Sequence, residues 1–286
     1  MKTVLLHLDD HDSLPAMLQA ALLVARTFGG HVEGLHVRPG VSRMVPMGPE
    51  GAGLATTDLV ESLEREGERV SIRLRAMFED FMRGHDVALT DGIPPSSEPT
   101  ASWSEAVAIG EEALASHGRA FDLLVAGRPV AGQIGPRMGA LESALFESGR
   151  PVLVVPPEVP QKLGRRLVIN WNGSTETART VGFGMPFLAR AEEVLVLSVE
   201  EGMVPGPAGK DVATCLIRNG VPARAKHIEA GGRAEVGPAV LDACAGMGAD
   251  LLLKGAYTQS RLRQMIFGGA TSHILGAATI PVLMAH

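Results

Sequence analysis

Short runs of consecutive apolar residues, each followed by a segment with helical periodicity, recur along the whole chain. Residues 4–8 form the first run, and the helical pattern after it passes through Leu18, Leu22 and Ala25. The runs are continuous rather than alternating, so both faces of the sheet that they form must be covered. The pattern therefore predicts parallel β-sheets with helices on both faces.

The apolar runs of the first half return in the second half in the same order, which is the signature of an internal repeat. The matched segments are residues 4–10 and 167–174, 32–37 and 194–199, 121–127 and 249–255, and 150–155 and 280–285. We therefore expect two α/β domains, residues 1–156 and 165–286. A proline-rich stretch at residues 157–164 reads as the linker between them.

The first half is longer in its middle, and the surplus has an unusual composition. Residues 39–53 are rich in glycine and proline, and a strongly charged stretch follows at about residues 57–83. We expect a mobile loop and then a long helix. We interpret the helix charges as a solvated face.

Composition excludes several classes of protein. The 286 residues are 45% hydrophobic with a formal net charge of -6, which is enough to build apolar cores and disfavours general nucleic-acid binding. We see no apolar run of membrane-spanning length and no leader before the first run, so we expect a cytoplasmic protein without membrane contact. We interpret Cys215 and Cys244 as reduced, buried, small hydrophobic residues rather than a redox pair.

A split glycine loop near the C-terminus is the strongest candidate for binding chemistry. Gly255 ends an apolar run, Thr258 follows it, and Gly268 to Thr271 open the next helical segment. Backbone amides at a helix N-terminus hold phosphate groups well, and glycine permits their close approach. The loop therefore predicts a phosphate-binding site in the second half.

The corresponding loop of the first half has lost these features. Met138 stands opposite Gly268, Leu141 stands opposite Thr271, and the loop is shorter. Gly139 and Ala140 stand opposite Gly269 and Ala270. We therefore expect no nucleotide site in this half. Its glycines read as turn residues: Gly127, Gly132, Gly135 and Gly139.

These motifs resemble the tandem members of the universal stress protein family. The resemblance rests on the Asn172-Gly173-Ser174 phrase after the first strand of the second half, the G-x2-G-x9-G-[ST]-like loop, and the final Pro-Val-Leu strand. It implies a five-stranded, mostly parallel sheet in each domain, of the adenine-nucleotide alpha-hydrolase (Rossmann-like) type. It also implies that some members bind ATP, with Mg2+ held mainly by the phosphates. The ligand positions implied are Asn172, Val199, Gly255, Thr258, Gly268, Gly269, Ala270 and Thr271.

Two departures from the family pattern leave two interpretations open, a working nucleotide site and a loop whose glycines serve only as turns. Thr258 occupies the second glycine position, where a positive φ would cost a β-branched residue about 1 to 2 kcal/mol. Gly269 occupies a position usually held by Ser or Thr, and the lost hydroxyl removes about 1 kcal/mol of hydrogen bonding.

Four further residues each have a structural interpretation as well as a functional one. Asn172 either contacts the nucleoside or caps the following helix. Trp171 is better read as a buried aromatic at a strand end than as a base contact. Asp9 is at least as well explained by a turn or cap. We expect His273 to be a surface helix residue.

The sequence contains no convincing nucleophile, general base or metal cluster, so we lean against an enzyme. We therefore rank three functional hypotheses in this order: a stress-response binding or signalling module, a slow ATPase, and a ligand-free interaction scaffold. The resemblance also implies that residues 151–155 and 281–285 pair within one chain, which would cover two sheet edges at once. Whether two chains form a homodimer stays open.

Overall fold

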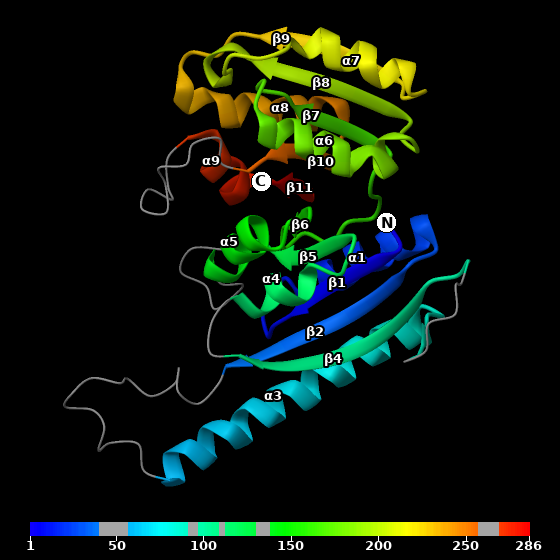
Figure 1. Ribbon diagram of the computed structural model, residues 1–286, viewed down its shortest axis with the longest axis vertical. Coiled ribbons are helices and arrows are strands. Elements are labelled where there is room, and N and C mark those ends of the chain that lie inside the picture. Colours follow the sequence, from blue (N-terminus) through cyan, green and yellow to red (C-terminus); the bar gives the residue numbers. More distant parts are fainter. Residues whose placement is uncertain (40–56, 91–96, 109–111, 130–137, 257–268) are drawn as a thin grey trace, which may run out of the picture.

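The computed structural model describes residues 1–39, 57–90, 97–108, 112–129, 138–256 and 269–286. Its strands form one 11-stranded sheet in the order β3-β4-β2-β1-β5-β6-β11-β10-β7-β8-β9 (Figure 1). All neighbouring strands are parallel except β6 and β11, which are antiparallel. The sheet thus consists of two parallel halves that meet at one antiparallel pair, as two tandem α/β domains require.

The strands and helices follow the matched segments of the sequence. The strands of the first half are β1 (Thr3–Leu8), β2 (His31–Pro39), β3 (Ala88–Leu89), β4 (Thr100–Ala108), β5 (Leu123–Gly127) and β6 (Val152–Val155). Those of the second half are β7 (Arg166–Asn170), β8 (Glu193–Val199), β9 (Ala223–Ile228), β10 (Leu251–Gly255) and β11 (Val282–Ala285). The described helices are α1 (Leu14–Phe28), α3 (Thr57–Gly84), α4 (Glu112–Gly118), α5 (Met138–Glu147), α6 (Thr175–Leu188), α7 (Gly209–Arg218), α8 (Val236–Met247) and α9 (Ala270–Ala277).

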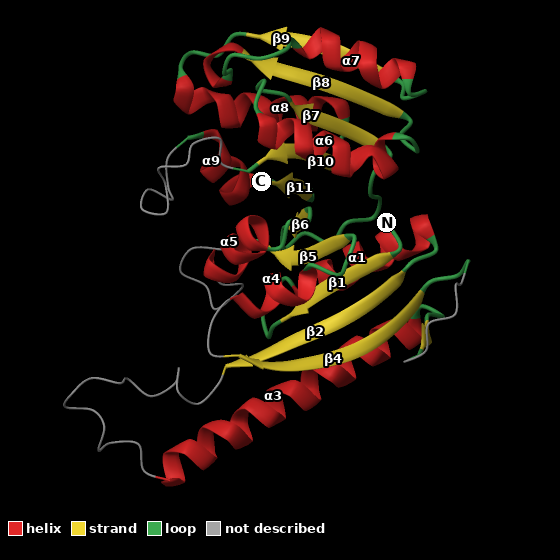
Figure 2. Ribbon diagram, viewed as in Figure 1, coloured by secondary structure: helices red, strands yellow, loops and turns green. Residues whose placement is uncertain are grey.

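Helices cover the two faces of the sheet (Figure 2), and an apolar core lies on each face. Side chains of α1, α3, α6 and α7 form one core with strand residues such as Leu6 and Leu253. Side chains of α4, α5, α8 and α9 form the other core with Leu5 and Leu252. Successive strand residues point to opposite faces, so both kinds of position are apolar. The prediction of a parallel sheet covered on both faces is confirmed.

The antiparallel pair β6–β11 joins the two halves. Leu153 lies opposite Leu283 in the register, and both side chains are fully buried. Phe28 of α1 and Phe187 of α6 add an edge-to-face contact across the junction, with ring centroids 5.1 Å apart. The expected pairing of the two final strands is therefore present, and neither β6 nor β11 leaves a free edge.

An aspartate of the repeat holds the first strand of each half in place. Asp122 accepts hydrogen bonds from the backbone amides of Lys2 (2.5 Å) and Thr3 (3.2 Å). Asp250 accepts them from the amides of Gly164 (2.8 Å) and Arg165 (2.9 Å). The Asp-Leu-Leu phrase shared by the two halves is therefore explained by strand anchoring.

The long charged helix is present as α3, and its surface pairs include Arg65 with Glu61 at 2.6 Å. Most of the expected loop at residues 39–53 lies outside the described residues. The second half has the expected five strands, whereas the first half has a sixth because the two-residue strand β3 extends its edge. No helix in the described ranges is long and apolar enough to cross a membrane.

The expectation that both cysteines are buried is wrong for one of them. Cys244 is buried in the core between α8 and the sheet, and burial raises the pKa of its thiol to about 12. Cys215 is exposed on α7, because it lies on the solvent side of that amphipathic helix, one residue before the buried Leu216.

Candidate functional site

The carboxyl ends of the parallel strands of the second half meet at one edge of the sheet. In open α/β sheets this edge is where ligands bind. Here β7 leads to Asn172, β8 ends at Val199 and β10 ends at Gly255. The helix α9 returns the chain to β11 beside these strand ends (Figure 1).

Asn172 supports the turn that leads from β7 into α6. Its side-chain oxygen accepts hydrogen bonds from the Ser174 amide (3.2 Å) and the Thr177 hydroxyl (2.7 Å). Ser174 is the N-cap of α6 and accepts a hydrogen bond from the Thr177 amide. The cap of α6 is therefore Ser174 and not Asn172, whose oxygen holds Ser174 and Thr177 in place, and the nucleoside contact of Asn172 stays a prediction.

Trp171 and Val199 are both buried at this edge, on opposite faces of the sheet. The Trp171 indole N–H donates to the Pro207 carbonyl at 2.8 Å, and its ring belongs to the core formed by α6 and α7. The interpretation of Trp171 as a buried aromatic at a strand end is confirmed. Val199 is 2% exposed and packs in the other core, below α8.

Gly255 is required by packing. A Cβ at this position would lie 2.5 Å from the amide nitrogen of Thr177 in the first turn of α6. The strand end and the helix N-terminus therefore touch through backbone alone. The structure explains this glycine without a ligand, although its backbone still faces the edge where a ligand would enter.

The N-terminus of α9 is formed by Gly269, Ala270 and Thr271. Gly269 is the N-cap, with φ 90° and ψ -171°, and a Cβ there would meet no atom of the described residues within 4 Å. The first turn contains no acidic residue, and no side chain caps it. Amides of a first helical turn have no partner inside the helix and carry a partial positive charge. This N-terminus is thus electrostatically suited to an anion.

The candidate residues not yet discussed lie either at the surface or outside the described residues. Thr258 and Gly268 lie outside the described residues. His273 is exposed, and its side chain packs over Gly237 of α8, where an added Cβ would lie 2.8 Å from the His273 Cβ. His273 is therefore the surface helix residue that the sequence indicates.

Several solved structures share the architecture of this chain over nearly its whole length. A universal stress protein from Archaeoglobus fulgidus DSM 4304 superposes with a TM-score of 0.68 at 16% identity, covering 99% of this chain and 95% of that one. A proposed universal stress protein from Pseudomonas aeruginosa UCBPP-PA14 gives 0.51 at 13% identity, covering 100% and 93%. A protein of unknown function from Pseudomonas aeruginosa PAO1 gives 0.55 at 12% identity, covering 100% and 92%.

The chain has the universal stress protein fold. The likeness extends over both halves, which supports the resemblance that the sequence motifs indicate at the level of fold. No family model matches the sequence, and no curated protein matches it either. Identities of 12 to 16% establish architecture and carry no information about the ligand.

Within this universal stress protein fold, the matching edge of the first half is built differently. Asp9 accepts a hydrogen bond from the Asp10 amide at 2.9 Å, a turn interaction, and Asp10 pairs with Arg73 of α3. The helix α5 already includes Met138, whereas α9 starts only after Gly269. Leu141 is 2% exposed and belongs to the core. Gly132 and Gly135 lie outside the described residues.

A charged residue of the second half, Lys254, was missed by reasoning from sequence. It is 7% exposed, and its ammonium donates to the Gly255 carbonyl at 3.1 Å. Burial lowers the pKa of its amine to about 8. A lysine inside an apolar strand run, where the matched position of the first half is Ala126, is the sequence signal that marks it.

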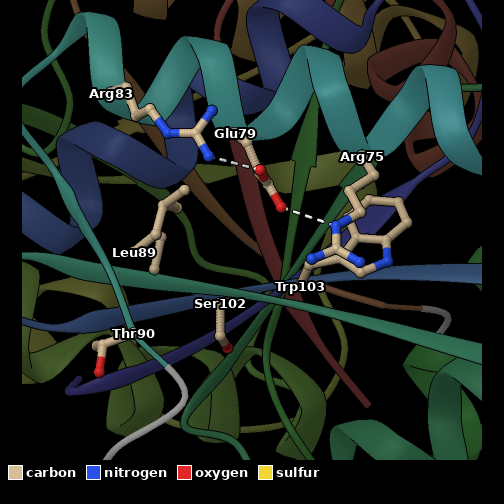
Figure 3. A pocket seen from close by; sticks show the side chains of 8 residues that line it. Arg75, Glu79, Arg83, Leu89, Thr90, Ser102 and Trp103 are labelled. Carbon is tan, nitrogen blue, oxygen red and sulfur yellow. Dashed lines mark hydrogen bonds and ion pairs between the residues drawn. The ribbon is translucent and has the colours of Figure 1, made fainter.

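A cavity of about 310 Å³ lies far from this edge, between α3 and the amino end of β4 (Figure 3). Arg75 and Arg83 each contact Glu79 at 2.7 Å. The hydrogen bond from Arg75, with that from Arg83, keeps the pKa of Glu79 below its ordinary value although burial opposes the shift. All three residues lie on α3, so we interpret these ion pairs as stabilising the helix itself.

Proposed function

We propose that the protein binds an adenine nucleotide, ATP, at the carboxyl edge of its second half and acts as a stress-response binding module in the cytoplasm. The observation that carries the proposal is the N-terminus of α9. It begins at a glycine with positive φ, where an added Cβ would contact none of the described residues, and it contains no acidic residue in its first turn. Such an N-terminus favours a phosphate group.

The surroundings of this N-terminus are consistent with a nucleotide. Val199 ends β8 and Asn172 follows β7 at the same edge of the sheet, so both lie in the part of the chain where we propose the nucleoside binds. The described residues contain no cluster of three or more His, Cys, Asp or Glu side chains suited to a metal. We therefore propose that Mg2+ reaches the site with the phosphates as its main ligands.

Substitutions at Thr271 test this proposal without disrupting the helix. Aspartate in a first helical turn stabilises the helix, because it complements the partial positive charge there. The same carboxylate repels a phosphate. For Thr271→Asp we expect at least tenfold weaker binding of Mg-ATP by calorimetry, with an unchanged or higher melting temperature. The matched neutral variant Thr271→Asn should lose only about threefold, the value of part of one hydrogen bond.

The wild-type measurements separate the three functional hypotheses. Saturable heat with Mg-ATP and no phosphate release supports the binding module. Phosphate release above that of Thr271→Asp would replace it with the slow ATPase. If wild-type protein gives no heat, and nucleotide leaves its melting temperature unchanged, the proposal is overturned and the interaction scaffold becomes the better hypothesis.

A further inference from the structure

Strand register fixes where the Lys254 side chain points. Leu252 and Ala256, two residues to either side, belong to the core beneath α8 and α9. Because side chains alternate along a strand, Lys254 points to the same face. Its direct neighbours in the register are Asn170 of β7 and Met284 of β11. The Lys254 side chain is thus buried, and the two residues beside it in the sheet carry no charge.

The structure provides little to offset the charge of this amine. The Gly255 carbonyl accepts one of its three possible hydrogen bonds, and no described carboxylate forms an ion pair with it. Burial is the cause of its lowered pKa, which falls to about 8. An ammonium ion removed from water without a counter-charge is strongly unfavourable. An anion at this position would remove that penalty.

Helix α9 brings its N-terminus to the level of Lys254. The eight residues of α9 span about 12 Å, and after the turn at residues 278–281 the four residues of β11 span about 13 Å in the return direction. The first turn of α9 therefore lies near the carboxyl end of β11, which pairs with Gly255 through Ala285. Ala270 packs against the same core that Lys254 faces.

We propose that Lys254 and the N-terminal amides of α9 together bind a phosphate group of the ligand, with the buried ammonium as its counter-charge. This inference rests on the proposed nucleotide site and names the cation that the site uses. The first half supplies the internal comparison. Ala126 occupies the matched position there, in the same strand context, so the fold itself does not require a lysine.

Proton uptake is the measurement that separates this role from a structural one. At pH 8.5 an amine with a pKa near 8 is mostly neutral, and a bound phosphate restores its charge. Binding should then take up as much as about three-quarters of a proton. ATP itself is fully ionised at this pH. The elements packed around β10 carry these ionisable groups: Glu176 and Arg179 of α6 on the opposite face, the buried Cys244 of α8, whose pKa is raised to about 12 by burial, and the exposed Arg233, Glu235, Asp242, His273 and His286.

The experiment is calorimetry of Mg-ATP binding at pH 8.5 in Tris and in EPPS, which differ in ionisation enthalpy. Three proteins are compared: wild type, Lys254→Met, and Lys226→Met as the control. Methionine has nearly the length of lysine and suits the apolar surroundings, while Lys226 is exposed on β9. We expect Lys254→Met to bind at least tenfold more weakly and without the uptake. The control should match wild type.

A second readout keeps the inference testable if ATP does not bind. The pKa of Lys254 is followed by NMR of 13Cε-labelled lysine, assigned by comparison with Lys254→Met, with and without inorganic pyrophosphate. A rise in this pKa on adding pyrophosphate supports the phosphate site even if the nucleotide proposal fails. If wild type binds ATP while Lys254→Met binds it equally well, only the role of Lys254 is overturned. An unchanged Lys254 pKa with both ligands overturns it as well.

Discussion

The two halves of the molecule repeat one fold, yet their carboxyl edges differ at a few positions. Asp122 and Asp250 anchor the first strand of each half in the same way. At the edge, however, the first half has Ala126 and a helix that already includes Met138. The second half has Lys254 and a helix that begins after Gly269. The strand interiors therefore specify the fold, and a few edge residues decide which half is suited to an anion.

Substitutions at the matched strand positions Ala126 and Lys254 should change the free energy of unfolding the most. Ala126 is 3% exposed in an apolar core, so Ala126→Lys buries a cation without a partner and should cost about 3 to 5 kcal/mol of stability. Lys254→Met should instead stabilise the ligand-free protein by about 3 kcal/mol at pH 7, from the difference between a pKa of about 8 and the ordinary 10.5. Urea denaturation measures both changes.

The pH dependence of the Lys254 effect has a definite sign. The folded-state pKa is below the unfolded one, so the cost of the buried charge is complete below pH 8 and disappears as pH rises toward 10.5. The advantage of Lys254→Met should therefore shrink over this interval. A variant that is less stable than wild type at pH 7 would show that Lys254 contributes to the core rather than straining it.

The paired aspartates should differ in their response to pH, although their roles match. Burial acts to raise the pKa of Asp122, but hydrogen bonds from the Lys2 and Thr3 amides prevail and lower it. Asp122→Asn should therefore cost about 1 to 2 kcal/mol at pH 7, and the difference should fade as pH falls through the lowered pKa. At Asp250 burial prevails and raises the pKa.

Because its ionised form is disfavoured in the folded state, Asp250→Asn should cost less than Asp122→Asn at pH 7. Urea denaturation at pH 7 and at pH 3 compares the two variants. Equal losses at both pH values would contradict the assigned difference in pKa.

The smallest expected changes in stability come from the N-cap residues of the first helix in each half. Ser174 accepts a hydrogen bond from the Thr177 amide at 3.2 Å, whereas Ser13, the N-cap of α1, makes no such bond through its side chain. Ser174→Ala should cost about 1 kcal/mol and Ser13→Ala less than about 0.5 kcal/mol. Thermal denaturation of the two variants checks the order, and a reversed order would refute the capping assignment.

The repeat made most of the architecture predictable from sequence. Continuous apolar runs predicted the central strands and their covered faces. The apolar runs did not predict the outer strands β4 and β9, because strands at or next to the edge of a sheet need not be apolar. In β9, Arg224 and Lys226 are exposed. The two-residue strand β3 has too short a pattern to be recognised. The exposure of Cys215 depends on which side of α7 meets the sheet.

The sequence alone determined the tandem α/β plan and the candidate loop, because both depend on the order of residues along the chain, whereas the expected pairing of the two final strands came from the family resemblance. Tertiary structure decided what individual residues do. Gly255 is required by a helix that contacts it from residue 177, and the Asn172 oxygen is used by α6. Lys254 becomes distinctive only when both faces of its strand are covered, because a charge has a cost only once water is removed.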